Sequence, residues 1–360
     1  MEVALRILIV GAGPTGLTAG VELARRNIHA EVIDRRDEAS PFSRAVGILP
    51  RSLKTLEASG VTPKLLKQGQ KFRMARFYRG DRLILSLPLT VRQPLHGYDF
   101  ILGLAQDRTE AALRDAFVGF GGAVSYGTEL MALRQERDGV IAETSEGKEL
   151  AFDYVIGADG VRSKAREELG IAFDGIDLPE TWSIADVDAE DWPNANAFTV
   201  CQLPGGEVAV VAPLDVNRYR VISNTEDALA ALPLPMNVTH VRREGQFKIS
   251  VRQVSQYSKD RVFLAGDAAH CHSPVGGRGM NLGIADAADL AARFAEGAIG
   301  GYSAARHAGG ARVIAQSEQA RKVLTSANPI ARGLVLLGLR LASVVPPMQR
   351  AMSHQVLYGE

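Results

Sequence analysis

Short apolar runs that end near glycine or aspartate recur along this chain of 360 residues. They are typical of buried strands in a parallel sheet, and they span residues 4–10, 29–34, 152–159 and 261–267. Residues 14–27 lie between the first two runs and carry apolar side chains three or four positions apart, which predicts an amphipathic helix. The chain therefore begins with a predicted strand, helix and strand.

Two stretches interrupt this alternation of buried strands and helices. Residues 71–102 begin with alternating apolar and polar positions that predict a hairpin turning at Gly80, and residues 171–255 are rich in strand-like segments. Beyond residue 267 the pattern is helical nearly to the end. We expect an α/β fold: a doubly wound domain with an inserted, mostly antiparallel β-sheet domain and a helical C-terminal region.

These patterns divide the chain into three parts. The doubly wound domain is expected to be discontinuous. The expected parts are residues 1–70, 103–170 and 256–296 for the doubly wound domain, 71–102 and 171–255 for the inserted sheet domain, and 297–360 for the C-terminal helices.

The composition is that of an ordinary globular protein, with 46% apolar and 23% charged residues. The 41 basic and 41 acidic side chains balance, so we expect no general attraction to nucleic acid. The two cysteines lack metal-ligand spacing, and His270 and His272 have no further ligands at suitable spacing, so no metal site is expected.

We expect a cytoplasmic protein, a monomer or a homodimer. Two isolated cysteines suit a reducing compartment, and the N-terminus shows no signal-peptide pattern. The most apolar late segment, residues 329–349, is cut by Arg332 and Arg340 into pieces too short to span a membrane. Residues 297–360 hold seven Lys or Arg against two Asp or Glu, so these helices could dock on the body, on a subunit or on a membrane surface.

The first predicted strand runs into "GAGPTG", in which Gly11, Gly13 and Gly16 have the GxGxxG spacing. Gly11 allows a tight turn, Gly13 lets a pyrophosphate approach the backbone, and Gly16 lets helix and strand pack closely. Asp34 ends the second strand, where a carboxylate can accept hydrogen bonds from ribose hydroxyls. The motif predicts a dinucleotide and leaves NAD and FAD open.

Two later strands end in similar loops. "GADGVRSKAR" places Asp159 and Gly160 after a strand, and "GDAAHCHSPVGGRGMNLG" places Asp267 after another, ahead of a glycine-rich helix start. Loops that follow parallel strands in a doubly wound fold converge on one crevice. Three loops with glycine and aspartate therefore predict one long ligand that touches all of them.

These three motifs, in this order, resemble the FAD-dependent aromatic hydroxylases, the p-hydroxybenzoate hydroxylase-like group A flavoprotein monooxygenases. The resemblance implies FAD as cofactor and NADPH or NADH as reductant. It also implies that the doubly wound domain binds FAD and is the cofactor domain, and that the inserted sheet domain binds the substrate and is the substrate domain. It implies that reduced flavin and O2 form a C4a-hydroperoxide, which transfers oxygen to an aromatic, phenolic small molecule. The residues expected at FAD are Gly11, Gly13, Pro14, Thr15, Gly16, Asp34, Arg35, Arg44, Gln106, Asp159, Gly160, Gly266, Asp267, Pro274, Gly277, Gly279, Met280 and Asn281.

No catalytic base identifies itself, and the resemblance leaves two candidates for a catalytic role. The carbonyl of Pro274 could accept the proton of a substrate hydroxyl, or this proline is only a rigid turn. Arg278 stands where the family often has Gln, and it faces the flavin side, solvent or an acid of another helix. The polar and aromatic substrate candidates of the inserted sheet are Tyr78, His96, Tyr98, Gln202, Tyr219 and Arg220.

Two other functions remain open at this point. A flavin-dependent oxidase, epoxidase or reductase of an isoprenoid, quinone or polyketide would use the same cofactor loops. A flavin-binding protein without turnover would also keep them, although nothing in the residues requires it.

Overall fold

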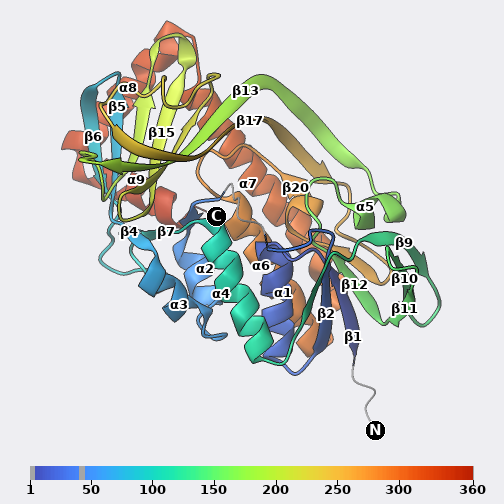
Figure 1. Ribbon diagram of the computed structural model, residues 1–360. Helices are drawn as coiled ribbons and strands as arrows, with labels where there is room; N and C mark the ends of the chain where they lie inside the picture. The colour runs from blue at the N-terminus through green and yellow to red at the C-terminus, as the bar shows by residue number, and fades with distance from the viewer. Residues whose placement is uncertain (1–4, 40–44, 360) are drawn as a thin grey trace.

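A computed structural model describes residues 5–39 and 45–359 of the chain. Its first sheet has six strands in the order β18-β19-β12-β1-β2-β8, and all but β18 run parallel (Figure 1). Each apolar run identified above supplies one of the parallel strands, because a strand covered on both faces needs apolar side chains on both. The strands are β1 (Arg6–Val10), β2 (His29–Asp34), β8 (Val124–Tyr126), β12 (Tyr154–Gly157), β18 (Ser258–Lys259) and β19 (Val262–Leu264).

Helix α1 packs against β1 and β2 and contacts both α4 and α6 (Figure 1). The contact between α1 and α4 is close, since a Cβ on Gly20 would lie 3.1 Å from the Phe117 ring. The core under these helices includes Ile7, Leu8 and Ile9, each fully buried. The helices of this part are α1 (Pro14–Ala24), α2 (Pro50–Thr55), α3 (Val61–Gln68), α4 (Gln106–Gly119), α5 (Lys164–Leu169) and α6 (Gly279–Glu296).

The second large sheet has eight strands in the order β20-β17-β13-β16-β15-β14-β5-β6 and is mostly antiparallel, as predicted. Two of its strands, β13 and β17, are 18 residues long and run from the parallel sheet into the inserted part (Figure 1). Its strands are β5 (Met74–Arg79), β6 (Arg82–Pro88), β13 (Phe173–Glu190), β14 (Phe198–Gln202), β15 (Val208–Asp215), β16 (Arg218–Ser223), β17 (Asn237–Val254) and β20 (His270–Cys271).

Strand register divides the eight-stranded sheet into two faces. Arg76, Thr199, Val211 and Val221 pair across successive strands and share one face, which we call the outer face. Arg220 lies on the opposite, inner face, where its Nη1 donates a 3.3 Å hydrogen bond to the carbonyl of Ala45 from the cofactor domain. The inner face is therefore the one turned toward the cofactor domain.

Two small sheets complete the β structure. One is the antiparallel sheet of β9 (Leu130–Gln135), β10 (Val140–Thr144) and β11 (Glu149–Phe152). The other joins β3 (Gly47–Ile48), β7 (Ile101–Gly103) and β4 (Gln70–Phe72). Short 3-10 turns are η1 (Pro204–Gly206), η2 (Gly266–Ala268) and η3 (Ile299–Gly301).

The chain ends in three helices, α7 (Tyr302–Leu324), α8 (Pro329–Val344) and α9 (Pro346–Tyr358). Ala342 of α8 and Leu357 of α9 are buried in a cluster with β5 and β6, so these helices dock on the body. The opposite side of α8 is exposed, with Leu334 at 65% and Leu337 at 54%. Among the described residues, no single helix is both long and apolar enough to cross a membrane.

Candidate cofactor site

Three loops meet at one edge of the parallel sheet because they leave three neighbouring strands. Val10, Gly157 and Leu264 lie at the same level of β1, β12 and β19. The backbone ladder continues past them, since Ala158 N donates to Val10 O at 2.8 Å and Ala265 N donates to Gly157 O at 3.0 Å. All three motifs predicted to share one ligand are thus brought together.

The three glycines of the first loop each have a distinct geometric role. Gly11 has a φ of +107°, and a Cβ there would lie 2.4 Å from the carbonyl oxygen of Ala158. A Cβ on Gly16 would lie 1.9 Å from Gly11 O, so helix α1 can approach β1 only without it. A Cβ on Gly13 would meet no described atom within 4 Å, and Gly13 is itself the N-cap residue of α1, so it has no side chain that could cap the helix. This open, uncapped helix start fits a pyrophosphate.

Asp34 is buried at the end of β2 and is held from three directions. Its Oδ2 accepts a 2.7 Å hydrogen bond from Ala12 N, and both carboxylate oxygens accept from the Arg36 guanidinium at 2.9 Å. Burial alone would raise the pKa of Asp34, but the hydrogen bonds from Arg36 and Ala12 outweigh it and hold the pKa below its usual value. Arg35, which is also expected at FAD, has its Nη1 3.9 Å from Oε1 of Glu129.

The second loop places Asp159 beside the first. Asp159 Oδ2 accepts from Ala165 N at 3.1 Å, while its buried Oδ1 has no hydrogen-bond partner among the described residues. Burial raises the pKa of Asp159. Gly160 follows with a φ of +84°, which turns the chain into the loop before α5. An unsatisfied buried oxygen at this edge fits a ligand that donates a hydroxyl.

The third loop is packed directly onto the first. A Cβ on Gly266 would lie 2.4 Å from Thr15 Oγ1, and a Cβ on Gly283 would lie 2.2 Å from the same atom. Thr15 of α1 is therefore wedged between η2 and α6, which fixes the position of the loop between them. Asp267 is exposed at the tip of this turn.

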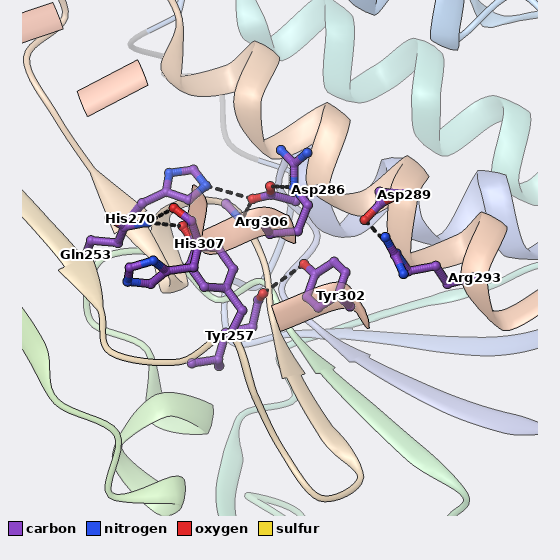
Figure 2. A network of polar contacts seen from close by, with 11 residues as sticks. Gln253, Tyr257, His270, Asp286, Asp289, Arg293, Tyr302, Arg306 and His307 are labelled. Atoms are coloured by element: carbon purple, nitrogen blue, oxygen red, sulfur yellow. Dashed lines mark hydrogen bonds and ion pairs between the residues drawn. The ribbon is translucent and has the colours of Figure 1, made fainter. Parts of the chain in front are cut away.

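A buried polar network holds this third loop from behind (Figure 2). Asp286 of α6 accepts from Gly266 N at 2.9 Å, lies 2.7 Å from His270 Nε2, and accepts from Arg306 Nε at 2.6 Å. Burial alone would raise the pKa of Asp286, but His270 and Arg306 lower it. Nearby, Tyr302 OH donates to Leu264 O at 2.9 Å. We did not predict this network from sequence, although an acid among the apolar residues of "LGIADA" is its one local signal.

The start of α6 is organised by Asn281. Its Oδ1 accepts from Leu49 N at 2.8 Å, and its Nδ2 donates to Gly47 O and Gly277 O, both at 2.9 Å. The side chain thus joins β3 to the glycine-rich turn. A ligand would therefore meet the backbone of Asn281 and not its side-chain amide. Met280 packs against the core of the cofactor domain.

The two catalytic candidates are both engaged with protein groups. Gly277 N donates to the carbonyl of Pro274 at 2.9 Å, so that carbonyl closes a turn. Arg278 reaches the C-terminal helices, where Nη1 donates to Gln316 Oε1 at 2.9 Å and Nη2 donates to Gln355 O at 3.2 Å. The structure thus directs the Arg278 guanidinium to α7 and α9.

Gln106 lies at the first turn of α4, next to the inner face. Its Oε1 accepts from Ala45 N at 3.1 Å and its Nε2 donates to Glu110 at 2.8 Å. Arg44, its expected companion at the flavin, lies outside the described residues. His272 is half-buried before the glycine-rich turn, and burial lowers its pKa to about 4.

The six substrate candidates do not converge on one place. Gln202 and Arg220 are buried on the inner face, where Arg220 forms a bidentate pair with Asp186 at 2.6 and 2.7 Å. Tyr219 lies on the outer face in a core with Trp192. The remaining three contact protein groups elsewhere: Tyr78 with Asn194, Tyr98 with Glu57, and His96 with the Tyr358 ring.

Comparison with known proteins agrees with this geometry. A profile of the FAD binding domain family matches residues 4–228 and 214–308. The 6-methylpretetramide 4-monooxygenase of Streptomyces rimosus is 29% identical over 98% of this chain and 68% of its own length. The pentachlorophenol 4-monooxygenase of Sphingobium chlorophenolicum is 34% identical over 80% of this chain and 58% of its own length.

The same fold occurs in a solved structure of nearly equal length. The p-nitrophenol 4-monooxygenase PnpA from Pseudomonas putida superposes with a TM-score of 0.88 at 22% identity, covering 98% of this chain and 97% of the other. At that identity the likeness concerns the fold alone. This chain spans about 58% to 68% of the two curated relatives named above, which are longer proteins.

Proposed function

This chain belongs to the FAD binding domain family, and from that premise we propose that it is a FAD-dependent monooxygenase that uses NAD(P)H and O2 to hydroxylate an aromatic, phenolic small molecule. The observation that carries the proposal is the convergence of three glycine-lined loops on the carboxyl ends of β1, β12 and β19. Two relatives that act on aromatic compounds, by their names, support the substrate class. Bound FAD supplies the redox chemistry that none of these side chains can provide.

In this proposal the chain's residues divide the work of binding. The uncapped start of α1 would hold the pyrophosphate, and the ionised Asp34 would accept hydrogen bonds from the adenosine ribose. Asp267 would bind the ribityl chain or, through water, the pyrophosphate, and the Oδ1 of Asp159 would accept a hydrogen bond from a hydroxyl of the cofactor. The backbone N–H groups of the first turn of α6, at Gly279 and Met280, would stabilise negative charge on the flavin ring.

The inner face of the eight-stranded sheet would close the site above the flavin. Arg220 of β16 is fully buried and Gln202 at the end of β14 almost fully, so water has little access to either side chain. Exclusion of water matters because it keeps oxygen transfer from being lost to side reactions. The protein positions the reactants and shields them, while no side chain identifies itself as a base.

The test is direct. Purified protein should carry one non-covalent chromophore per chain that acid releases as FAD. Phenols and polyketide-like aromatics should then be screened for faster oxidation of NADPH and of NADH, with the product mass measured. A product heavier by one oxygen atom supports a monooxygenase. Reductant consumption that yields only H2O2, or a dehydrogenated product, would point to an oxidase or reductase instead, and release of FMN would overturn the proposal.

A further inference from the structure

A cavity of about 520 Å³ opens in the substrate domain away from the cofactor loops. It is bounded by residues 71–76 around β4 and β5 and by residues 192–197 after β13. Of its lining residues, Arg76 lies on the outer face of the eight-stranded sheet, and Trp192 packs against that face. The sheet itself therefore separates this cavity from the inner face that is turned toward the cofactor domain.

Three residues that line this cavity each have one buried donor atom without an acceptor among the described residues. Trp192 is 4% exposed and Asn194 is 2% exposed, yet Trp192 Nε1, Asn194 Nδ2 and Arg76 Nε have no hydrogen-bond partner among the described residues. The orientation of the amide is fixed, because Asn194 Oδ1 already accepts from Arg76 Nη1 and from Tyr78 OH. Buried donors are normally paired, so three on one wall indicate a missing acceptor.

The charged residues that line the cavity are positive, so they too would attract an acceptor with negative charge. Lys71, Arg73 and Arg76 line the cavity, and none of the Asp or Glu residues that the structure describes does. Arg73 pairs outside it with Asp99 at 2.9 Å, and Lys71 Nζ lies 5.2 Å from the centre of the Phe100 ring. Arg76 itself is held in place, since Nη1 also donates to Pro193 O at 3.2 Å. The lining thus combines Arg76, which is held in place, with two exposed cations, Lys71 and Arg73.

We propose that this cavity is a second ligand site that binds an organic anion through a carboxylate or phosphate group. Such a group presents several oxygen acceptors to several donors at once, which matches the set on the wall. The volume is within the range of about 300–1,000 Å³ that is usual for small-molecule sites. The bound anion would contact Trp192 and Asn194 on one side of the sheet, while the flavin lies on the other.

A single-tryptophan form of the protein provides a local reporter. The chain has two tryptophans, so Trp182→Phe leaves Trp192, on the cavity wall, as the only one. The holoprotein should be titrated at constant ionic strength with benzoate, with phenyl phosphate and with inorganic phosphate. We expect saturable changes in Trp192 fluorescence, and the three probes distinguish a carboxylate from a phosphate and an organic anion from a free ion. The flavin absorbance should not follow the same titration curve.

Three variants locate the site, and one serves as a control. Arg76→Met and Asn194→Leu should each weaken binding at least tenfold, about the loss expected for one charged or buried hydrogen bond. Lys71→Ala should also weaken binding, and it is less prone to misfold because Lys71 is exposed. Arg82→Gln, at an exposed arginine on β6 outside the cavity, should bind like the parent. The proposal is overturned if no probe saturates, or if folded variants bind as tightly as the parent.

Discussion

At the scale of single residues, Asp286 shows how one carboxylate fixes a loop to which it does not belong. It lies in α6, fully buried, and accepts the amide of Gly266, which precedes Asp267 (Figure 2). His270 and Arg306 hold its charge, because an isolated buried carboxylate would be costly. The backbone of the third cofactor loop is thereby held at its base, and the exposed Asp267 side chain is presented from a fixed turn.

From this placement we expect Asp267→Ala to weaken FAD binding. Loss of one hydrogen bond to a buried partner costs about 1–3 kcal/mol, or roughly a factor of 5 to 150 in affinity. Titration of flavin-free protein with FAD, followed by flavin fluorescence, measures it. Asp289→Ala is the matched control, since Asp289 lies in α6 and pairs with Arg293 of the same helix. An unchanged dissociation constant in Asp267→Ala would remove this residue from the site.

His272 predicts how stability depends on pH. Burial lowers the pKa of His272 in the folded state to about 4 from the usual 6.5 of a histidine, so between these values the unfolded chain binds a proton that the folded chain does not. The folded protein therefore keeps the stability that depends on a neutral His272 above pH 6.5, and it loses this stability as the pH falls from 6.5 toward 4. The slope from this one group stays below about 1.4 kcal/mol per pH unit.

Urea unfolding at several pH values checks the effect of His272. The decline of the unfolding free energy between pH 6.5 and pH 4 should be shallower in His272→Gln than in the parent protein. His29→Gln, at an imidazole with 59% side-chain exposure, should leave the slope unchanged. Equal slopes in all three proteins would show that His272 titrates normally in the folded state.

The residues that could be predicted from sequence are those whose role follows from their neighbours in the chain. Gly11, Gly13 and Gly16 were identified because a strand, a turn and a helix are adjacent, and their backbone geometry agrees. Arg36 and Asp286 were not identified as structural partners of the site, since their contacts depend on chain segments brought together only by folding. Whether the expected residues touch FAD stays a prediction.

At the scale of elements, the contact between α1 and α6 decides whether the cofactor loops can meet. Thr15 Oγ1 occupies the space that a Cβ on Gly283 would need, at 2.2 Å. We therefore expect Gly283→Ala to destabilise the protein by about 1–3 kcal/mol, the usual cost of overpacking, and to weaken FAD binding because the first and third loops are pushed apart. Urea unfolding and FAD titration measure the two effects.

A second substitution makes this prediction sharper. Thr15→Ala removes Oγ1 and leaves the Thr15 Cβ at an ordinary 3.5 Å from the new methyl group. The double variant should recover much of the stability that Gly283→Ala loses, so the two changes should be strongly non-additive. Additive losses would mean that the helix contact is not limited by this pair of atoms.

Strands and helices were predicted better than the contacts between them. The apolar runs became parallel strands, and the hairpin at Gly80 formed between β5 and β6. The sequence does not show which side of α8 packs on the body. Leu334 and Leu337 form an apolar side but lie exposed, whereas Leu336 and Ala342 are buried. Both sides of that helix are apolar, so periodicity alone could not choose between them.

At the scale of the whole molecule, two sheets of different construction share one chain. The parallel sheet carries the loops predicted to bind FAD, and the inner face of the antiparallel sheet is turned toward it. The division into domains expected from sequence rests on the alternation of helical and β-rich stretches. Its exact boundaries stay a prediction, since β4 and β7 pair with β3 in a small sheet of their own.

The long pair β13 and β17 connects the cores of both parts. At one end, Phe173 pairs with Val254, which is buried in the core of the cofactor domain. Toward the other end, Ala185 pairs with Glu244 and is buried in the core of the outer face. The same two strands are therefore structural members of two separate hydrophobic cores.

Such sharing has a thermodynamic consequence: neither core can melt alone, because losing one frays the strands on which the other is built. We expect calorimetry of the FAD-loaded protein to give a single endotherm, with calorimetric and van't Hoff enthalpies that agree. Far-ultraviolet dichroism and flavin release should follow the same temperature curve. Two resolved endotherms would mean that the ribbon of β13 and β17 comes apart in the middle and that the molecule melts as two independent cooperative units.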